Sequence, residues 1–197
     1  MTQLRIIGAG GHGKVVAETA EACGYSDIAF LDISWPERHS NGCWPIVGVP
    51  QQMKTKLFCA IGRNNLRAQF FNDLNLNDSP ILLHPTAVIS PTANLGAGTL
   101  AVAGSIVNAD AEVGRGVNLN TGCSVDHDCR VGDFAHISPG ARLAGGVSVG
   151  EQTWIGIGAV VREGIKIGNN VLVAAGAAVV SDIEDGAQVG GVPARKV

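Results

Sequence analysis

Aromatic residues are scarce in this chain, and charged residues are not abundant either. Phe, Trp and Tyr make up 5% of the 197 residues and charged residues 16%, whereas 46% are hydrophobic and 27 are glycine. An ordinary globular core of this size uses more Phe and Trp. The composition therefore indicates a core of stacked aliphatic side chains with glycines at tight corners.

Other absences exclude whole classes of protein. The 14 Lys and Arg residues are scattered and the net charge is -3, so the sequence has no electrostatic footprint for nucleic acid. No apolar run approaches the length of about eighteen residues that a membrane-spanning helix needs. The first residues also lack the basic and apolar segments of a secretory signal. We therefore expect neither nucleic acid nor a membrane as a partner.

The five cysteines are odd in number and lack CxxC spacing. They are Cys23, Cys43, Cys59, Cys123 and Cys129. We expect them to be small buried hydrophobic residues in a reducing compartment, rather than disulfides or the ligands of a zinc knuckle. The sequence thus predicts a soluble cytoplasmic protein.

A six-residue period dominates the chain from Leu83 onward. Every sixth residue from there to Val179 is aliphatic, and the positions four further on are mostly small. This period fits neither a helix nor an alternating strand, but it is typical of a hexapeptide β-solenoid with three short strands in each coil. The aliphatic positions are Leu83, Ile89, Leu95, Ala101, Val107, Val113, Leu119, Val125, Val131, Ile137, Leu143, Val149, Ile155, Val161, Ile167, Val173 and Val179. Seventeen such positions predict about six coils.

The first eighty residues follow a different pattern. Apolar runs at 4–7, 28–31, 46–49 and 57–61 predict strands, and helical spacing covers 15–23 and 64–74. The order of these elements predicts a small, parallel, Rossmann-like α/β domain over residues 1–80. The solenoid domain then spans 81–197, with an irregular C-terminal tail that we expect against the last coils.

A glycine-rich loop separates the first strand from the first helix. Gly8, Gly10 and Gly13 have the spacing of a dinucleotide-binding fingerprint, and Asp32 lies a suitable distance downstream. Because about eighty residues are too few to enclose a complete dinucleotide, we favour a single nucleotide diphosphate, as in an activated sugar, with Asp32 near its uracil or ribose. His12 would present an exposed imidazole to a phosphate or a sugar hydroxyl. The alternative is a tight turn that binds no ligand.

A histidine flanked by two carboxylates lies in the middle of the solenoid. The repeat directs Val125 and Cys129 inward and leaves Asp126, His127 and Asp128 outside, where a carboxylate would make His127 a good general base. A solvated surface turn is the competing interpretation. A zinc site would need a ligand from a neighbouring chain, and the spacing to the next histidine is unlike a compact ligand pair, so we expect no metal.

These motifs together resemble the left-handed β-helix sugar O/N-acetyltransferases that carry a small N-terminal nucleotide-binding domain. The nearest resemblance is to the enzymes that N-acetylate UDP-4-amino sugars in bacterial bacillosamine synthesis, and the sialic acid O-acetyltransferases are relatives. The resemblance covers nearly the whole chain. It rests on Gly8-Ala9-Gly10-Gly11-His12-Gly13, Phe30-Leu31-Asp32, Ala60-Ile61-Gly62 with Asn64, His84-Pro85, Asn120, Val125-Asp126-His127-Asp128-Cys129, His136 and Gly191-Val192-Pro193-Ala194.

The resemblance implies a role for particular residues. His127 would be the general base, tuned by Asp128 and Asp126, and acetyl-CoA would be the co-substrate. Asn120 would contact the sugar near its amine. The remaining implied contacts are His136 with the acetyl carbonyl, Gly145, Ile157 and Ala175 with the acetyl-CoA arm, and Gly10, His12, Asp32, Ala60 and Ile61 with the nucleotide.

The family resemblance also implies a homotrimer with active sites in the clefts between solenoids. One position departs from the pattern, since Ile33 replaces a second acidic residue after Asp32. This substitution bears on the identity of the nucleotide base.

The resemblance therefore implies an acetyl-CoA-dependent N-acetyltransferase. We expect it to acetylate the C4 amine of a nucleotide-linked, UDP-type 4-amino-4,6-dideoxy sugar directly, because neither Ser124 nor Cys129 is placed to be an acyl-carrying nucleophile. Acetylation of a sugar hydroxyl is the alternative within the same family. Two other classes remain open, namely a zinc-dependent γ-type carbonic anhydrase and a nucleotide-sugar-binding protein without turnover.

Overall fold

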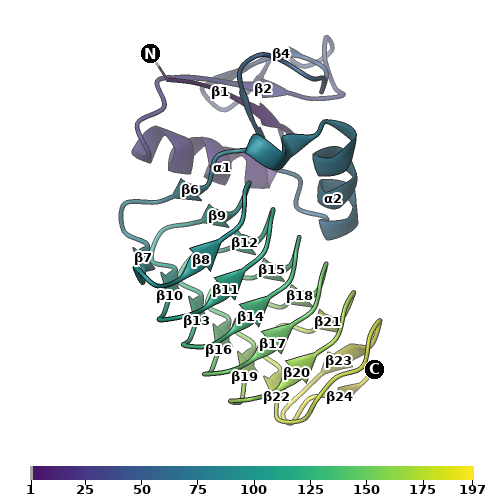
Figure 1. Cartoon of the computed structure of the whole chain (residues 1–197). Helices are drawn as coiled ribbons and strands as arrows, with labels where there is room; N and C mark the ends of the chain where they lie inside the picture. Colours follow the sequence, from purple (N-terminus) through teal and green to yellow (C-terminus); the bar gives the residue numbers. More distant parts are fainter. Residues whose placement is uncertain (1) are drawn as a thin grey trace.

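The computed structural model describes residues 2–197 as an α/β domain mounted on one end of a β-solenoid (Figure 1). The α/β domain has a five-stranded sheet in the order β3-β4-β2-β1-β5. Its strands are β1 (Gln3–Ile7), β2 (Asp27–Leu31), β3 (Ser40–Asn41), β4 (Trp44–Gly48) and β5 (Lys56–Cys59), and its helices are α1 (Gly11–Ala22), α2 (Asn64–Asp73) and the short 3-10 helix η1 (Leu76–Asp78).

The sheet is mixed, so the prediction of a wholly parallel sheet is wrong at one edge. Strands β1, β2, β4 and β5 pair in parallel, but β3 runs antiparallel to β4. The cause is a tight turn at Gly42, where a positive φ of 66° reverses a segment that the sequence suggested was irregular. Helix α1 also begins at Gly11, four residues before the predicted start at Val15.

The two helices pack against opposite faces of this sheet. Val16, Ala17 and Ala20 of α1 are buried in one hydrophobic cluster with Leu4 and Phe30. Residues of α2 are buried in a second cluster with the strand residues of the other face, namely Ala68 and Phe71 with Ile7, Leu31 and Cys59. This arrangement follows from the alternation of side chains along a strand.

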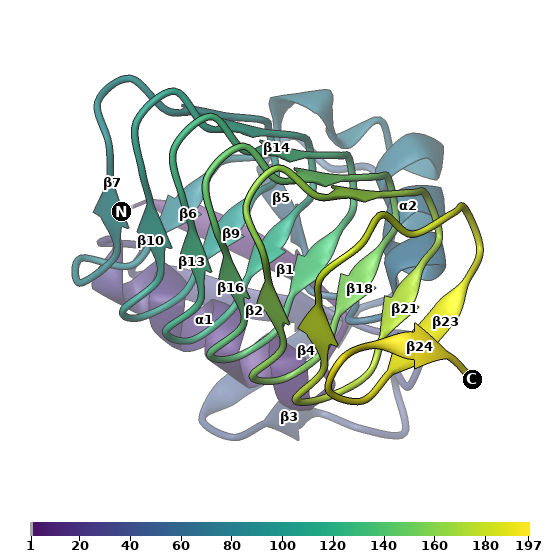
Figure 2. The ribbon, with the colours of Figure 1, turned by 90° about the horizontal axis from the view of Figure 1, so that it is seen from below.

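The solenoid consists of strands of two residues, or three in β23, that stack into three faces (Figure 2). The first face contains β6 (Leu82–Leu83), β9 (Leu100–Ala101), β12 (Asn118–Leu119), β15 (His136–Ile137), β18 (Trp154–Ile155), β21 (Leu172–Val173), β23 (Gln188–Gly190) and β24 (Arg195–Lys196). The second face contains β7 (Val88–Ile89), β10 (Ile106–Val107), β13 (Ser124–Val125), β16 (Arg142–Leu143), β19 (Val160–Val161) and β22 (Ala178–Val179). The third contains β8 (Asn94–Leu95), β11 (Glu112–Val113), β14 (Arg130–Val131), β17 (Ser148–Val149) and β20 (Lys166–Ile167). The six strands of the second face agree with the predicted number of coils.

The interior of the solenoid follows the predicted pattern. The aliphatic second residue of nearly every strand and the small corner residues form one continuous buried cluster. Val125, Cys123 and Cys129 are fully buried, which confirms their inward orientation. All five cysteines are free, but Cys23 and Cys43 are exposed, so the expectation that every cysteine is buried is wrong for these two.

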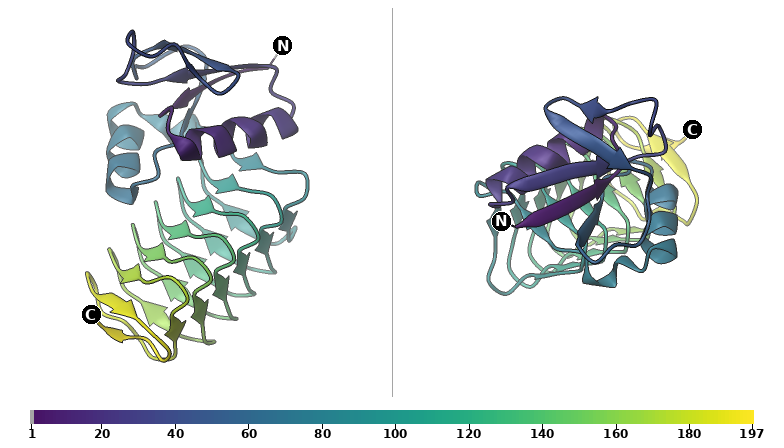
Figure 3. Two further views of the ribbon diagram at one scale, coloured as in Figure 1. Left: turned by 180° about the vertical axis from the view of Figure 1, so that it is seen from behind. Right: turned by 90° about the horizontal axis from the view of Figure 1, so that it is seen from above.

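The α/β domain rests on the first coils, and the tail closes the opposite end (Figure 3). Leu82 and Leu100 share the hydrophobic cluster of α1, and the Phe71 and Phe134 rings meet edge to face with centroids 5.3 Å apart. The tail lies against the last coil as expected, but it is not irregular: β23 extends the first face and β24 folds back antiparallel to it. Over the described residues, no helix has the length and the apolar character that crossing a membrane requires.

Candidate active site

The glycine loop makes a sharp connection from β1 into α1. Gly8 has a φ of 100°, a conformation that side chains strongly disfavour, and its N–H donates to the carbonyl of Leu31. A Cβ atom on Gly13 would overlap the carbonyl oxygen of Gly8. These two glycines are therefore required by the turn itself.

Asp32 fastens this loop to the end of β2. One carboxylate oxygen accepts the N–H of Ala9 at 2.6 Å and the other accepts the N–H of Ser34 at 2.9 Å. Burial of the carboxylate raises its pKa, but these donors and the charge of Arg38 outweigh that effect, so the pKa of Asp32 is lowered. The role of Asp32 that the structure describes is to shape the loop.

Two residues of the segment between β2 and β4 brace the same loop. Arg38 donates to the carbonyl of Ala9 at 2.7 Å, and the amide of Asn41 donates to the carbonyl of Gly10 at 2.9 Å. Sequence reasoning missed both residues, because a polar segment gives no sign of which distant carbonyls it will contact.

Gly10, Gly11 and Gly62 differ from the structural glycines, because a Cβ on any of them would meet no described atom within 4 Å. They flank the ends of β1 and β5, where the strand order reverses direction, and this is where open α/β sheets bind ligands. Helices α1 and α2 both begin beside this point without a side-chain cap. The crevice therefore offers free backbone N–H groups and two positive dipole ends to an anion.

Below the glycine loop, His12 faces polar residues of the first solenoid face. Its ring centroid lies 6.1 Å from that of His136, which in turn stacks on Trp154 at 4.1 Å. The prediction of an exposed imidazole at His12 is wrong, since the side chain is half-buried between the α/β domain and the solenoid and its Nε2 atom is fully buried. Burial and the charge of Arg67 lower the pKa of His12.

His136 is buried and neutral. Burial, followed by the charges of Arg67 and His12, lowers its pKa to about 3. Its Nε2 atom lies 3.2 Å from the Asn120 amide nitrogen, and Asn120 Oδ1 accepts the N–H of Thr121. Because this second bond fixes the orientation of the amide, Nε2 is the acceptor and the proton of His136 resides on Nδ1.

His127 has the opposite environment, at a corner between the second and third faces. Its side chain is 62% exposed, and its Nδ1 atom lies 2.7 Å from a carboxylate oxygen of Asp128. A Cβ atom on Gly145 would lie 2.6 Å from the imidazole Nε2, so only glycine leaves room for the ring over that backbone. The hydrogen bond to Asp128 raises the pKa of His127, desolvation partly offsets this effect, and the charges of Asp126 and Asp128 add to the increase.

Asp126 has a different role from Asp128. It accepts the N–H of His127 and the side-chain amide of Asn108, each at 2.8 Å. The hydrogen bond from Asn108 is the main reason that the pKa of Asp126 is lowered. Asp126 thus holds the turn, whereas Asp128 orients the imidazole.

The predicted site residues at the corners of the solenoid fall into two groups on opposite edges of the second face. Asn120, Ile157 and Ala175 lie at the corner between the first and second faces, and Ile157 is 61% exposed there. His127 and Gly145 lie at the corner between the second and third faces. The contacts of a single chain therefore do not bring the two groups together.

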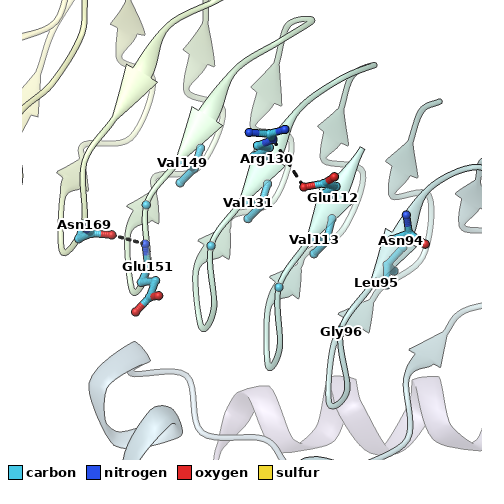
Figure 4. A pocket seen from close by; sticks show the side chains of 13 residues that line it. Asn94, Leu95, Gly96, Glu112, Val113, Arg130, Val131, Val149, Glu151 and Asn169 are labelled. Carbon is cyan, nitrogen blue, oxygen red and sulfur yellow. Dashed lines mark hydrogen bonds and ion pairs between the residues drawn. The ribbon is translucent and has the colours of Figure 1, made fainter. Parts of the chain in front are cut away.

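The third face carries a shallow groove of about 650 Å³ that contains none of the predicted site residues (Figure 4). On its surface, Arg130 forms an ion pair with Glu112 at 3.5 Å. The backbone N–H of Glu151 donates a hydrogen bond of 2.8 Å to the side-chain oxygen of Asn169. Within residues 2–197, no three His, Cys, Asp or Glu side chains converge as they would around a metal ion.

A hexapeptide solenoid that carries a nucleotide-type glycine loop and an exposed His–Asp pair defines the class of hexapeptide-repeat transferases. Comparisons with known proteins agree with this class. Residues 3–74 match the PglD N-terminal domain, and residues 146–180 match the bacterial transferase hexapeptide (six repeats). UDP-N-acetylbacillosamine N-acetyltransferase of Bacillus subtilis (strain 168) is 37% identical over 115 residues, a match that spans 52% of this chain and 52% of that protein.

Two solved structures match over almost their whole length. The acetyltransferase domain of PglB from Neisseria gonorrhoeae FA1090, in complex with acetyl coenzyme A, is 40% identical, with a TM-score of 0.93 and coverage of 100% of this chain and 99% of that one. PerB from Caulobacter crescentus, in complex with CoA and GDP-perosamine, is 38% identical, with a TM-score of 0.90 and coverage of 99% and 97%. The chain therefore belongs to the PglD-type hexapeptide-repeat sugar N-acetyltransferases, which are acetyltransferases that use acetyl-CoA.

The His127–Asp128 hydrogen bond gives a first prediction. In Asp128→Asn the carboxylate charge is lost, so the pKa of His127 should fall, as measured by NMR titration of the histidine ring protons. Asn suits the backbone, since Asp128 has a φ of 58° and Asn tolerates this region. Asp110→Asn is the matched control, because Asp110 has the same φ of 58° at the same corner one coil earlier. An unchanged pKa of His127 in Asp128→Asn would contradict the assignment.

Proposed function

We propose that this protein transfers the acetyl group of acetyl-CoA to the C4 amine of a nucleotide-linked 4-amino-4,6-dideoxy sugar, with His127 as the general base. The observation that carries the proposal is the His127–Asp128 pair lying over Gly145. Asp128 engages Nδ1, which leaves Nε2 to accept a proton from a substrate.

The proposed reaction is a direct transfer. The amine nitrogen bonds to the thioester carbonyl carbon, His127 Nε2 takes the amine proton, and the carbon–sulfur bond then breaks. The departing thiolate receives that proton from His127, and a backbone N–H near Gly145, or His136, would stabilise the developing oxyanion. Because a base must be unprotonated, the rate should fall as the pH drops through the raised pKa of His127.

The glycine loop supports a nucleotide diphosphate as the handle of the substrate. Gly10 and Gly62 leave the crevice between β1 and β5 open, and the two uncapped helix ends favour phosphate groups there. We place the nucleotide against Gly10, His12, Ala60 and Ile61, with the sugar reaching towards Asn120. The role of His136 beside the acetyl carbonyl stays a prediction.

The nucleotide itself is proposed from the relatives. The curated relative is named for a UDP sugar and the PerB structure contains GDP-perosamine. Ile33, beside Asp32, is 80% exposed and offers an apolar surface at the rim of the proposed site. We favour UDP, and the assay below compares both nucleotides.

The separation of the site residues supports a homotrimer with active sites between chains. In such an assembly the corner that carries Asn120, Ile157 and Ala175 of one chain would meet the His127 corner of the next. Acetyl-CoA would then lie in the cleft between the two solenoids, against Gly145, Ile157 and Ala175.

A thiol-release assay with acetyl-CoA tests the reaction. UDP-, dTDP- and GDP-linked 4-amino sugars and free sialic acid serve as acceptors, and we expect turnover with a UDP-4-amino sugar. His127→Ala should lower kcat by about a hundredfold or more without lowering Tm, since the side chain is exposed. Near-normal turnover by this variant would exclude His127 as the base. Turnover with sialic acid alone would instead indicate O-acetylation.

Two glycine substitutions distinguish glycines that the nucleotide needs for binding from glycines that the fold needs for stability. Gly10→Ala has room for its methyl group, so Tm should be retained while the affinity for UDP falls by about tenfold or more. Gly13→Ala should lower Tm, because its methyl group would overlap the carbonyl of Gly8. Calorimetric titration with UDP and thermal unfolding measure the two effects. Unchanged UDP affinity in Gly10→Ala would argue that the loop is a turn without a ligand.

Mixed assemblies test whether the site is shared between chains. Variants His127→Ala and His12→Ala are each expected to be inactive, but co-refolding them in equal amounts should restore about a quarter of the wild-type activity. The restored sites would combine an intact His127 from one chain with an intact nucleotide loop from its neighbour. A mixture that stays inactive, although light scattering shows mixed trimers, would mean that each chain carries a complete site.

A further inference from the structure

Among residues 2–197, Arg67 is the largest fully buried side chain, with 0% of its surface exposed. It projects from α2 into the junction between the α/β domain and the solenoid. Its guanidinium donates to the carbonyls of Ile61, Gly62, Gly116, Phe134 and Ala135 and to the side-chain oxygen of Asn64, at distances of 2.6 to 3.3 Å.

Every one of these acceptors is neutral. Within residues 2–197 no carboxylate forms an ion pair with Arg67. Burial lowers its pKa to about 10, so the side chain still carries its charge at neutral pH. A buried cation without a counter-charge is costly, and carbonyl dipoles that all converge on it provide the compensation. The geometry of the surrounding backbone is therefore tied to this one group.

The carbonyls of Ile61 and Gly62 belong to the turn between β5 and α2. A trans peptide directs its N–H opposite to its carbonyl. When both carbonyls point to the guanidinium, the N–H groups of Gly62 and Arg63, which directly precede the uncapped start of α2, point away from it. The same peptide geometry would be hard to maintain if the carbonyls had no partner.

The other carbonyls belong to the solenoid. Phe134 and Ala135 directly precede His136 on the chain, and both of their carbonyls accept from the same guanidinium nitrogen. Arg67 thus binds, with one planar group, the turn beside the open crevice and the segment that positions His136. The fork of donors in arginine can make these bonds together, whereas a lysine cannot.

We propose that Arg67 is a positioning residue for the nucleotide sugar: it orients the N–H groups of Gly62 and Arg63 towards the diphosphate and fixes that turn relative to His136. The inference rests on the proposed function, because it assumes that the crevice between β1 and β5 holds the nucleotide. Arg67 itself does not touch the ligand. Its removal should therefore affect the nucleotide sugar and leave acetyl-CoA unaffected.

The test compares Arg67→Met and Arg67→Lys with the wild-type protein, all as the full chain. For Arg67→Met, we expect KM for the nucleotide sugar and the dissociation constant for UDP to rise by about tenfold or more. KM for acetyl-CoA should change by less than about twofold. Arg67→Lys keeps the positive charge but loses the planar set of donors, so its KM for the nucleotide sugar and its dissociation constant for UDP should lie between those of the wild type and Arg67→Met. If Arg67→Met does not fold, Arg67→Lys should still fold and allow the test.

Arg5→Met is the matched control. Arg5 also donates to backbone carbonyls of the α/β domain, and it pairs with Asp27 at 2.9 Å away from the crevice. This variant should lower Tm without changing either KM. The inference is overturned if the Arg67 variants bind UDP as tightly as the wild type, or if they raise KM for both substrates equally. If the wild-type protein itself binds neither UDP nor GDP, the proposed nucleotide site fails and the inference fails with it.

Discussion

The parallel stacking of coils at an interval of eighteen residues, which holds from β6 to β22, is the constraint on which the rest of the structure depends. Asn118 pairs with Leu100, His136 with Asn118 and Trp154 with His136, each one coil apart. Residues separated by one coil must then lie at the strand spacing of about 4.8 Å. The stacking of His136 on Trp154, at 4.1 Å between ring centroids, is a direct result of this register. A single inserted residue would shift every later side chain to another position.

The docked α/β domain buries part of the first face and thereby changes the charge of its outward-facing side chains. Outward residues on a bare solenoid face water, but Asn118 and His136 lie at the junction with the α/β domain and are buried. Burial removes the charge from His136, and the same junction holds Arg67 with its full charge. The contact surface between the domains therefore combines an unpaired cation with neutral imidazoles. Such an environment favours a negatively charged or hydroxyl-rich ligand close by.

The sequence period predicted the solenoid and the outward position of the Asp126–His127–Asp128 segment, because a fixed period determines which side chains point inward. It could not distinguish the roles of the two carboxylates. That difference depends on the positive φ of Asp128, which turns its side chain to the imidazole while Asp126 binds Asn108. The sequence also could not predict the bracing roles of Arg38, Asn41 and Arg67. Their hydrogen-bond partners include backbone carbonyls that lie far away in the sequence. A carbonyl has no sequence signature.

His127 and His136 show how one fold gives the same residue type two opposite properties. They are nine residues apart, which is half a coil, so they must lie on opposite sides of the solenoid. One side is open and supplies a carboxylate, and the pKa of His127 is raised. The other is covered by the α/β domain and lies near a cation, and the pKa of His136 falls to about 3. An imidazole with a raised pKa and an imidazole with a strongly lowered pKa are therefore separated by the geometry of the coil.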